Sequence, residues 1–226
     1  MGIPPSLVWN PARPPERAPL EGALVRLEPI DPALHADSLF AATRGADAIW
    51  THLAYGPFDT KASFTKWLDE RAASKDPLFY AIVNRASGAA QGMASLMRFV
   101  PADGVIEVGH IWFAPILQRT REATEAIFDL AHHAFDDLGN RRLEWKCNSL
   151  NLASRRAADR FGFTFEGIFR QHMVVKGRNR DTAWFSIIDG EWPSRRAAFE
   201  AWLKADNFDP DGRQRRRLEE IREAPS

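Results

Sequence analysis

The sequence has 226 residues, of which 45% are hydrophobic and 27% are charged, values typical of a globular protein with a full core. Thirty basic residues balance thirty acidic ones, which argues against a broad nucleic-acid-binding face. The single cysteine, Cys147, excludes an internal disulfide and a cysteine-rich metal site, and no apolar run approaches the ~20 residues of a membrane span, so we expect a cytoplasmic protein.

The N-terminal residues 1–20 are rich in proline. Proline blocks both helices and central strands, so this segment is predicted to be an extended arm. The sequence leaves open whether the arm is disordered or wraps around the domain or a partner.

The first half of the following domain is predicted to combine two helices with antiparallel strands. Asp31, which precedes a proline, and Thr60 provide helix N-caps, and Asp103-Gly104 is a hairpin turn. In chain order we expect a strand over residues 24–29, helices over 31–42 and 60–73, and strands over 78–84, 90–100 and 105–113.

The second half alternates helices and strands. Pro115 ends the preceding strand, and Gly139 and Gly162 lie where C-cap glycines are expected. We expect a helix over residues 121–138, a strand over 142–146, a helix over 151–161, strands over 163–175 and 181–188 joined by a loop at 176–179, and a helix over 193–203. This order predicts one α+β domain at residues 21–205 and a charged tail at 206–226, either a solvated helix or a frayed end.

Four short motifs in the second half carry a family resemblance. Pro115-x-x-Gln118-x-x-Arg121-x-Ala123-Thr124-Glu125-Ala126 resembles the cofactor motif of the GNAT superfamily of N-acetyltransferases. The segment Asn151-x-x-Ser154-x-x-x-x-x-Arg160-x-Gly162-Phe163-x-x-Glu166-Gly167 is similar to the second signature of the branch that contains the RimJ and RimL ribosomal-protein acetyltransferases, and Gly177-x-x-Arg180-Asp181-Thr182 and Glu191-Trp192-Pro193 are similar to that branch's closing hairpin and tail.

The resemblance covers about residues 20–203 and implies both a fold and an activity. The fold is a single mixed, mostly antiparallel sheet, splayed at the cofactor site, with helices on both faces. The activity is direct transfer of an acetyl group from acetyl-CoA to a primary amine, on a protein N-terminus or a small molecule, without a metal. The alternative is a non-catalytic acyl-CoA-binding sensor or interaction module, because Arg121 replaces the motif's usual glycine and Met173 a family glutamate.

The expected cofactor site begins at a helix N-terminus, where unpaired backbone N–H groups and the helix dipole bind a pyrophosphate. Arg121 is expected to add positive charge there. The structural alternative is that this segment is an ordinary amphipathic helix that binds no cofactor. The resemblance further implies that pantetheine lies along the third hairpin strand. It also implies that Asn151 holds the pantetheine amide region and that Ser154 lies near the sulfur. The expected cofactor-binding residues are Ile111, Trp112, Phe113, Gln118, Arg119, Thr120, Arg121, Glu122, Ala123, Thr124, Asn151 and Ser154. Asn151 and Ser154 could equally serve as an N-cap and a first-turn residue.

Amine acetylation needs a group that removes a proton from the amine and one that protonates the leaving thiolate. Glu107 is the first candidate base, with an ion pair to an arginine as the structural alternative, and Ser154 is the candidate proton donor. Strand alternation places His110 on the opposite face from Glu107 unless a bulge occurs near Gly109. His172, the third candidate, is expected to face away from the site.

Several further residues have weaker assignments. Cys147 is interpreted as buried filler, and His132 and His133 as structural or surface residues. The loop residues Trp50, His52, Tyr55 and Phe58 could line an acceptor pocket or simply cover the core. The expected partner is the amine acceptor, with no membrane or nucleic acid, and the sequence permits a homodimer without requiring one.

Overall fold

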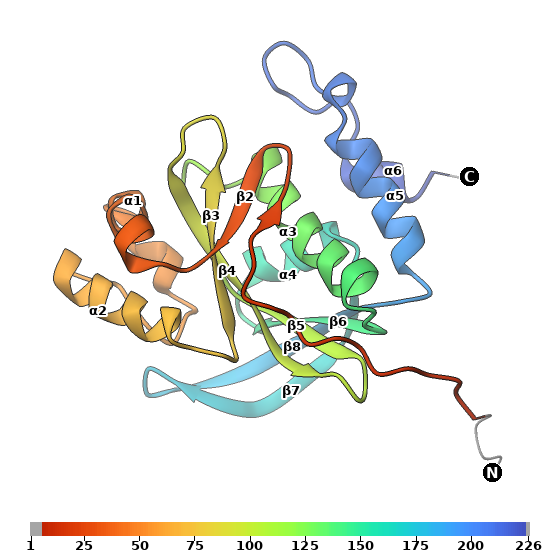
Figure 1. The fold of residues 1–226 in the computed structure, drawn as a ribbon, viewed down its shortest axis with the longest axis horizontal. Coiled ribbons are helices and arrows are strands. Elements are labelled where there is room, and N and C mark those ends of the chain that lie inside the picture. The colour runs from red at the N-terminus through yellow and green to blue at the C-terminus, as the bar shows by residue number, and fades with distance from the viewer. Residues whose placement is uncertain (1–5, 225–226) are drawn as a thin grey trace.

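An eight-stranded mixed sheet organises residues 6–224, the part of the chain that the computed structural model describes (Figure 1). Its order is β1-β2-β3-β4-β5-β6-β8-β7, and every neighbouring pair is antiparallel except β5–β6. The strands are β1 (Leu20–Glu21), β2 (Val25–Pro29), β3 (Leu78–Asn84), β4 (Ala90–Val100), β5 (Val105–Phe113), β6 (Arg142–Asn148), β7 (Thr164–Val175) and β8 (Arg178–Ile188).

Helices cover both faces of the sheet, as expected for the α+β fold predicted from the sequence. They are α1 (Pro32–Thr43), α2 (Lys61–Ala72), α3 (Arg121–His132), α4 (Leu152–Arg160), α5 (Trp192–Leu203) and α6 (Leu218–Arg222), with short helical turns η1 (Asp47–Trp50), η2 (His133–Asp137) and η3 (Ala205–Asn207). Within the described range no helix has the length and apolarity to cross a membrane. The predicted helix over residues 121–138 is α3 continued by η2, a π-helical turn, and Gly139 follows it.

The closing hairpin is tighter than expected. Val175 pairs with Arg178, so β8 begins three residues earlier than predicted and the turn consists of Lys176 and Gly177 alone. Both turn residues have positive φ, 49° and 71°, the backbone geometry that a two-residue turn between right-twisted strands requires.

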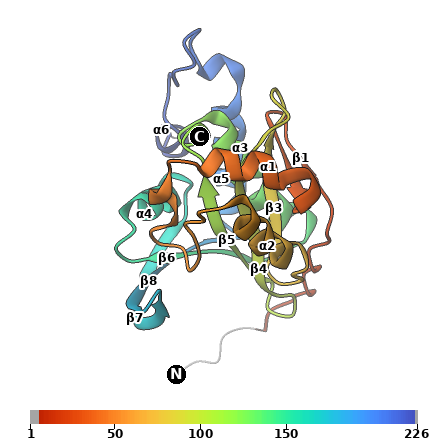
Figure 2. The ribbon, with the colours of Figure 1, turned by 90° about the vertical axis from the view of Figure 1, so that its left-hand side faces the viewer.

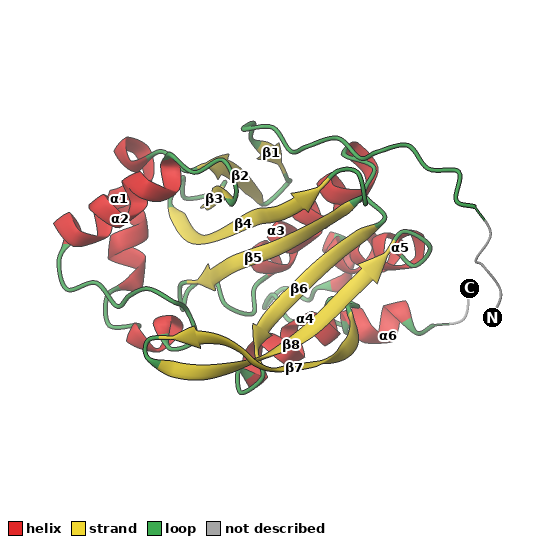
Figure 3. Cartoon of the chain, turned by 90° about the horizontal axis from the view of Figure 1, so that it is seen from below, coloured by secondary structure: helices red, strands yellow, loops and turns green. Residues whose placement is uncertain are grey.

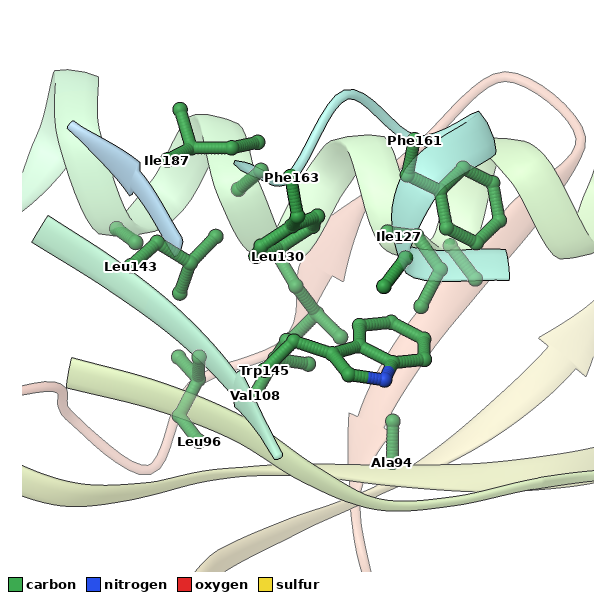
Figure 4. Close-up of a cluster of buried hydrophobic side chains, with 14 of the residues drawn as sticks. Ala94, Leu96, Val108, Ile127, Leu130, Leu143, Trp145, Phe161, Phe163 and Ile187 are labelled. Carbon is green, nitrogen blue, oxygen red and sulfur yellow. The ribbon is translucent and has the colours of Figure 1, made fainter. Parts of the chain in front are cut away.

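The larger hydrophobic core lies between the sheet and α3, α4 and α5. Figure 4 shows its centre, where Trp145 of β6 packs with Val108, Leu130 and Phe163. Each of these side chains is less than 5% exposed. Alternation along β5 and β6 therefore sends Glu107, Glu144 and Lys146 to the opposite face of the sheet.

A second core on that opposite face is smaller and covers only part of the sheet. Helices α1 and α2, seen from their own side in Figure 2, pack against β3, β4 and Trp112 at the end of β5. Figure 3 shows that β5, β6 and β8 present their lower face without a covering helix. We call this the open face, because no helix covers it.

Both chain ends in the described range pack against the domain. In the arm, Ala12 is buried and its N–H donates to the Pro101 carbonyl at 3.0 Å, while Trp9 donates to Ala102. Residues 1–5 of the predicted arm and 225–226 of the predicted tail lie outside the described range. The tail differs from a solvated or frayed end, because Leu218 of α6 is only 1% exposed and joins the larger core.

A buried carboxylate connects the β1–β2 hairpin to α3. Glu125 Oε2 accepts backbone hydrogen bonds from Leu24 at 2.5 Å and Val25 at 2.7 Å. Gly22 allows this close approach, because a Cβ there would lie 2.4 Å from Asp129 Oδ2. Asp129 Oδ2 is buried and has no hydrogen-bond partner within residues 6–224. Burial, followed by repulsion from Glu125, raises the pKa of Asp129 to about 7.

This raised pKa predicts a pH-dependent stability. A carboxyl group that binds its proton more tightly in the folded state stabilises the protein at low pH, and this stabilisation is lost as the pH rises through about 7. We expect Asp129→Asn to unfold with a free energy larger than the wild type's by roughly 2 kcal/mol at pH 8, and by less at pH 5. Urea denaturation at both pH values measures this, and a pH-independent difference would contradict it.

Candidate active site

The candidate site lies where β5 and β6 separate. Their parallel pairing runs from Val105–Arg142 to Val108–Trp145 and then stops. Beyond this point β5 continues beside β4, and β6 continues beside β8. The edge of β5 at residues 109–113 that faces β6 therefore has no strand partner in the described chain, which is the splayed arrangement expected at the pantetheine.

A bulge at the same point rotates His110. Met93 pairs with Trp112 and Ser95 with Gly109, so Ala94 lies opposite two residues of β5, and His110 has a φ of 52°. The extra residue reverses the alternation, as bulges do. His110 consequently lies on the same face as Glu107, which is the exception that the sequence allowed.

The loop before α3 forms a capped helix N-terminus. Thr120 is the N-cap, and its hydroxyl accepts a hydrogen bond from Ala123 N–H at 3.1 Å. The N–H groups of Arg121 and Glu122 have no acceptor within residues 6–224. Two free N–H groups at the positive end of a 12-residue helix are the arrangement that binds a phosphate.

Three side chains of this loop and of the first turn of α3 are engaged within the protein. The Arg121 guanidinium donates to the Leu203 carbonyl at 2.6 Å and stacks 4.3 Å from the Phe208 ring, so it anchors the C-terminal segment. The Gln118 amide donates to the Phe113 carbonyl at 3.0 Å. Thr124 is buried, and its hydroxyl hydrogen bonds to Thr120 and Arg160. The positive φ of the loop falls on Arg119, 62°, so helical geometry suffices at Arg121.

The start of α4 completes the cofactor side of the site. Asn151 caps the helix by accepting a hydrogen bond from Ser154 N–H at 3.1 Å, which is the structural role that the sequence also allowed for it. Ser154 Oγ accepts a hydrogen bond from Trp145 Nε1 at 3.0 Å, and its hydroxyl also lies in hydrogen-bond range of the Cys147 thiol. Cys147 is buried beside Ser154, and burial raises the pKa of its thiol, in keeping with a packing role.

Glu107 is a buried ion-pair partner. Lys146 Nζ lies 2.9 Å from its Oε2 and 2.5 Å from Glu144, and Arg98 Nε lies 3.7 Å away. The side chains of Glu107 and Lys146 are 7% and 6% exposed. Burial raises the pKa of Glu107, although Lys146 and Arg98 oppose that rise. The sequence predicted an arginine partner for Glu107 but did not predict Lys146. The one sequence signal for Lys146 is that it lies two residues after Glu144 on β6 and therefore on the same face of the sheet.

His110 lies deeper than a typical titrating histidine. Its Nδ1 is 3.1 Å from Tyr55 Oη, and its ring stacks on Tyr55 and contacts Phe79. Burial, followed by the positive charges of Arg71, Arg98 and Arg180, lowers the pKa of His110 to about 4. His110 is therefore neutral at neutral pH and holds protons weakly.

The aromatic loop mostly serves the smaller core. Trp50 is 1% exposed and packs against Phe58, Trp67 and Trp112, so covering the core explains it. Tyr55 instead reaches His110. His172 hydrogen bonds to Thr182 at 3.0 Å and packs on Trp184, placing it on the open face rather than away from the site.

The two helix histidines are paired within their own helix. His133 Nδ1 lies 2.7 Å from Asp137, and His132 Nε2 lies 3.8 Å from Asp136. Both contacts span four residues, which places the partners on one side of the helix. Across residues 6–224 no three histidine, cysteine or acidic side chains gather as a metal-binding group would require.

Known proteins resemble this chain in sequence and in fold. Residues 25–164 match the family model described as Acetyltransferase (GNAT) domain. A GCN5-related N-acetyltransferase from Brucella melitensis is 52% identical, with a TM-score of 0.94 over 96% of this chain and 99% of that one. A GNAT-family protein from Chromobacterium violaceum is 46% identical, with a TM-score of 0.79 over 85% of this chain and 97% of that one.

A curated relative matches over a shorter stretch. YdaF of Bacillus subtilis (strain 168), whose name places it among ribosomal N-acetyltransferases, is 30% identical over 105 residues. These residues are 46% of this chain and 57% of the relative, so the match spans little more than half of the relative's length.

The position of Arg121 predicts that its side chain supports the fold more than the cofactor. We expect Arg121→Gln to lower the free energy of unfolding by about 1–2 kcal/mol, through loss of the Leu203 hydrogen bond and the Phe208 contact. The KM for acetyl-CoA should change less than about twofold, because the free N–H groups remain. Arg119→Gln, which removes an exposed arginine of the same loop, is the charge control. A large rise in KM for Arg121→Gln alone would show that Arg121 contacts the phosphates.

Proposed function

The chain belongs to the GNAT acetyltransferase family, whose members use acetyl-CoA, and we propose that it moves the acetyl group directly to a primary amine. The observation that carries this proposal is the unpaired edge of β5 at residues 109–113, which lies between the capped N-terminus of α3 and Ser154. A pyrophosphate at Arg121 and Glu122 N–H and a pantetheine along this edge would bring the thioester to Ser154 and the open face. Ile111, Trp112 and Phe113 would pair with the pantetheine through their backbones, and Asn151 would hold its amide region.

The amine acceptor is proposed to enter from the open face. YdaF, named as a ribosomal N-acetyltransferase, makes a protein N-terminus one candidate, and a small-molecule amine is the other. No helix covers β5, β6 and β8 on this face (Figure 3).

Glu107 is proposed as the base. The amine nitrogen attacks the thioester carbon, the C–N bond forms, the C–S bond breaks, and one amine proton passes to Glu107 through water. His110, with a pKa of about 4, is a weaker acceptor: an α-amine near 8 would give it a proton at a cost of about 5 kcal/mol. Proton transfer to Glu107 costs less than transfer to His110, because burial raises the pKa of Glu107. Lys146 holds the Glu107 carboxylate in place.

Ser154 is proposed to donate its proton to the departing sulfur, which leaves as the free thiol. The proton taken up by Glu107 returns to Ser154 through solvent, so both residues are restored. Trp145 occupies one of its acceptor positions, which leaves the O–H as the group that can donate. The sulfur becomes negatively charged only in the transition state. A hydrogen-bond donor held beside the sulfur therefore stabilises the transition state more than the bound substrate.

Replacement of Glu107 tests the base. We expect Glu107→Gln to lower kcat on the order of 10²-fold or more and to remove the acidic limb of the pH profile, because a base must be deprotonated to act. That limb should lie above the ordinary carboxyl range, since burial raises the pKa of Glu107. Glu144→Gln is the matched control, because Glu144 binds the same lysine. Equal losses in both variants would assign the effect to Lys146 and reject Glu107 as the base.

Replacement of Ser154 tests the donor. We expect Ser154→Ala to lower kcat on the order of 10²-fold while the KM for acetyl-CoA stays within about threefold, the pattern of a group that acts in the transition state. Initial rates of thiol release measure both constants. A rise in KM with unchanged kcat would mean that Ser154 only binds the cofactor.

A further inference from the structure

The charges on the open face do not balance. They are four cations, Arg98, Arg142, Lys146 and Arg180, and three carboxylates, Glu107, Glu144 and Glu166. Lys146 contacts Glu107 and Glu144, Arg142 contacts Glu144 and Glu166, and Arg98 lies 3.7 Å from Glu107. Arg180 has no carboxylate within 4.0 Å among residues 6–224, so the face keeps one uncompensated positive charge.

A hydrogen bond holds Arg180 in place on β8, beside the end of β6 that lies beyond its separation from β5. Its Nε donates to Thr182 Oγ1 at 3.2 Å, and His172 Nδ1 contacts the same oxygen at 3.0 Å. Thr182 is fully buried and pairs with Asn148, the last residue of β6. The rest of the guanidinium has no hydrogen-bond acceptor in the described chain, although this group has five N–H donors.

The charge of Arg180 acts on three histidines around the proposed acceptor site. Its charge contributes to the lowered pKa of His52 in the aromatic loop, of His110 on β5 and of His172 on β7, in each case after burial. Burial also lowers the pKa of Arg180 itself. A half-buried cation without a counter-ion is costly, and an anionic ligand would remove that cost.

We propose that Arg180 binds a carboxylate carried by the acceptor, so that the preferred acceptor is an amine with a carboxylate a few bonds away. This inference rests on the proposed transfer of an acetyl group to an amine. The single excess charge matches a monoanionic carboxylate, and the planar guanidinium can bind both of its oxygens. The carboxylate could be the α-carboxylate of a free amino acid or an acidic side chain next to a protein N-terminus.

The test uses acceptors in matched pairs, with release of the CoA thiol as the signal. One arm compares free amino acids with their carboxamides, and the other compares N-terminal peptides with aspartate or asparagine at the second position. We expect wild-type kcat/KM to favour the carboxylate by about 10- to 100-fold in one arm, mainly through KM, as one charged hydrogen-bonded contact would give. The arm that shows the preference identifies the source of the carboxylate.

Arg180→Gln should reduce this preference to about one while leaving the kcat for the amides within about threefold. Arg170→Gln is the matched control: Arg170 is an exposed arginine of the same hairpin that acts on Asp181, away from the open face. The control should keep the full preference.

Three results decide between the possibilities. Equal turnover of carboxylates and amides by the wild type would overturn this inference and leave acetyl transfer intact. An equal loss of kcat for both acceptor types in Arg180→Gln would overturn it too, because Arg180 would then act on the reacting thioester. Absence of thiol release from every pair, with acetyl-CoA shown to bind by thermal shift, would reject the proposed function and this inference with it.

Discussion

The site depends on a parallel strand pair that stops early. β5 and β6 share only four residue pairs, the last being Val108–Trp145, and each strand then continues with a different antiparallel neighbour. Backbone groups in a sheet need partners, and here a ligand can provide them for β5. The last pair also supplies Trp145, whose indole N–H holds Ser154 at the start of α4. One interruption in the ladder thus positions the free edge and the nearby hydroxyl together.

The bulge at His110 extends this arrangement to the open face. Without the extra residue, His110 would lie in the larger core, and Glu107 would have no titratable neighbour further along β5. With it, a buried carboxylate and a neutral histidine share one face, and burial shifts the two pKa values toward the neutral forms. Lys146 counteracts this shift at Glu107, because opposite charges in a low-dielectric setting favour ionisation.

The loop before α3 shows how a motif position can change without loss of its backbone geometry. The residue in the glycine position, Arg121, is the first residue of α3 and adopts ordinary helical geometry, while the left-handed residue is Arg119. The Arg121 side chain leaves the loop toward Leu203 and Phe208, so it does not cover the helix N-terminus. The same contact fastens the C-terminal segment to the domain, together with buried Leu218.

The sequence by itself determined the strands and helices, the family and the capped helix α3, because periodicity, caps and turn residues are local. Strands β3, β4 and β5 have their predicted ends, and Thr60, Asp31 and Asn151 cap helices as expected. Only the tertiary structure decided which side chains meet. The pairing of Glu107 with Lys146 joins residues 39 positions apart, and the contact of Arg121 with Leu203 joins residues 82 positions apart. The placement of His110 on the same face as Glu107 depends on a bulge. Such contacts depend on strand order and register, which no local pattern in the chain encodes.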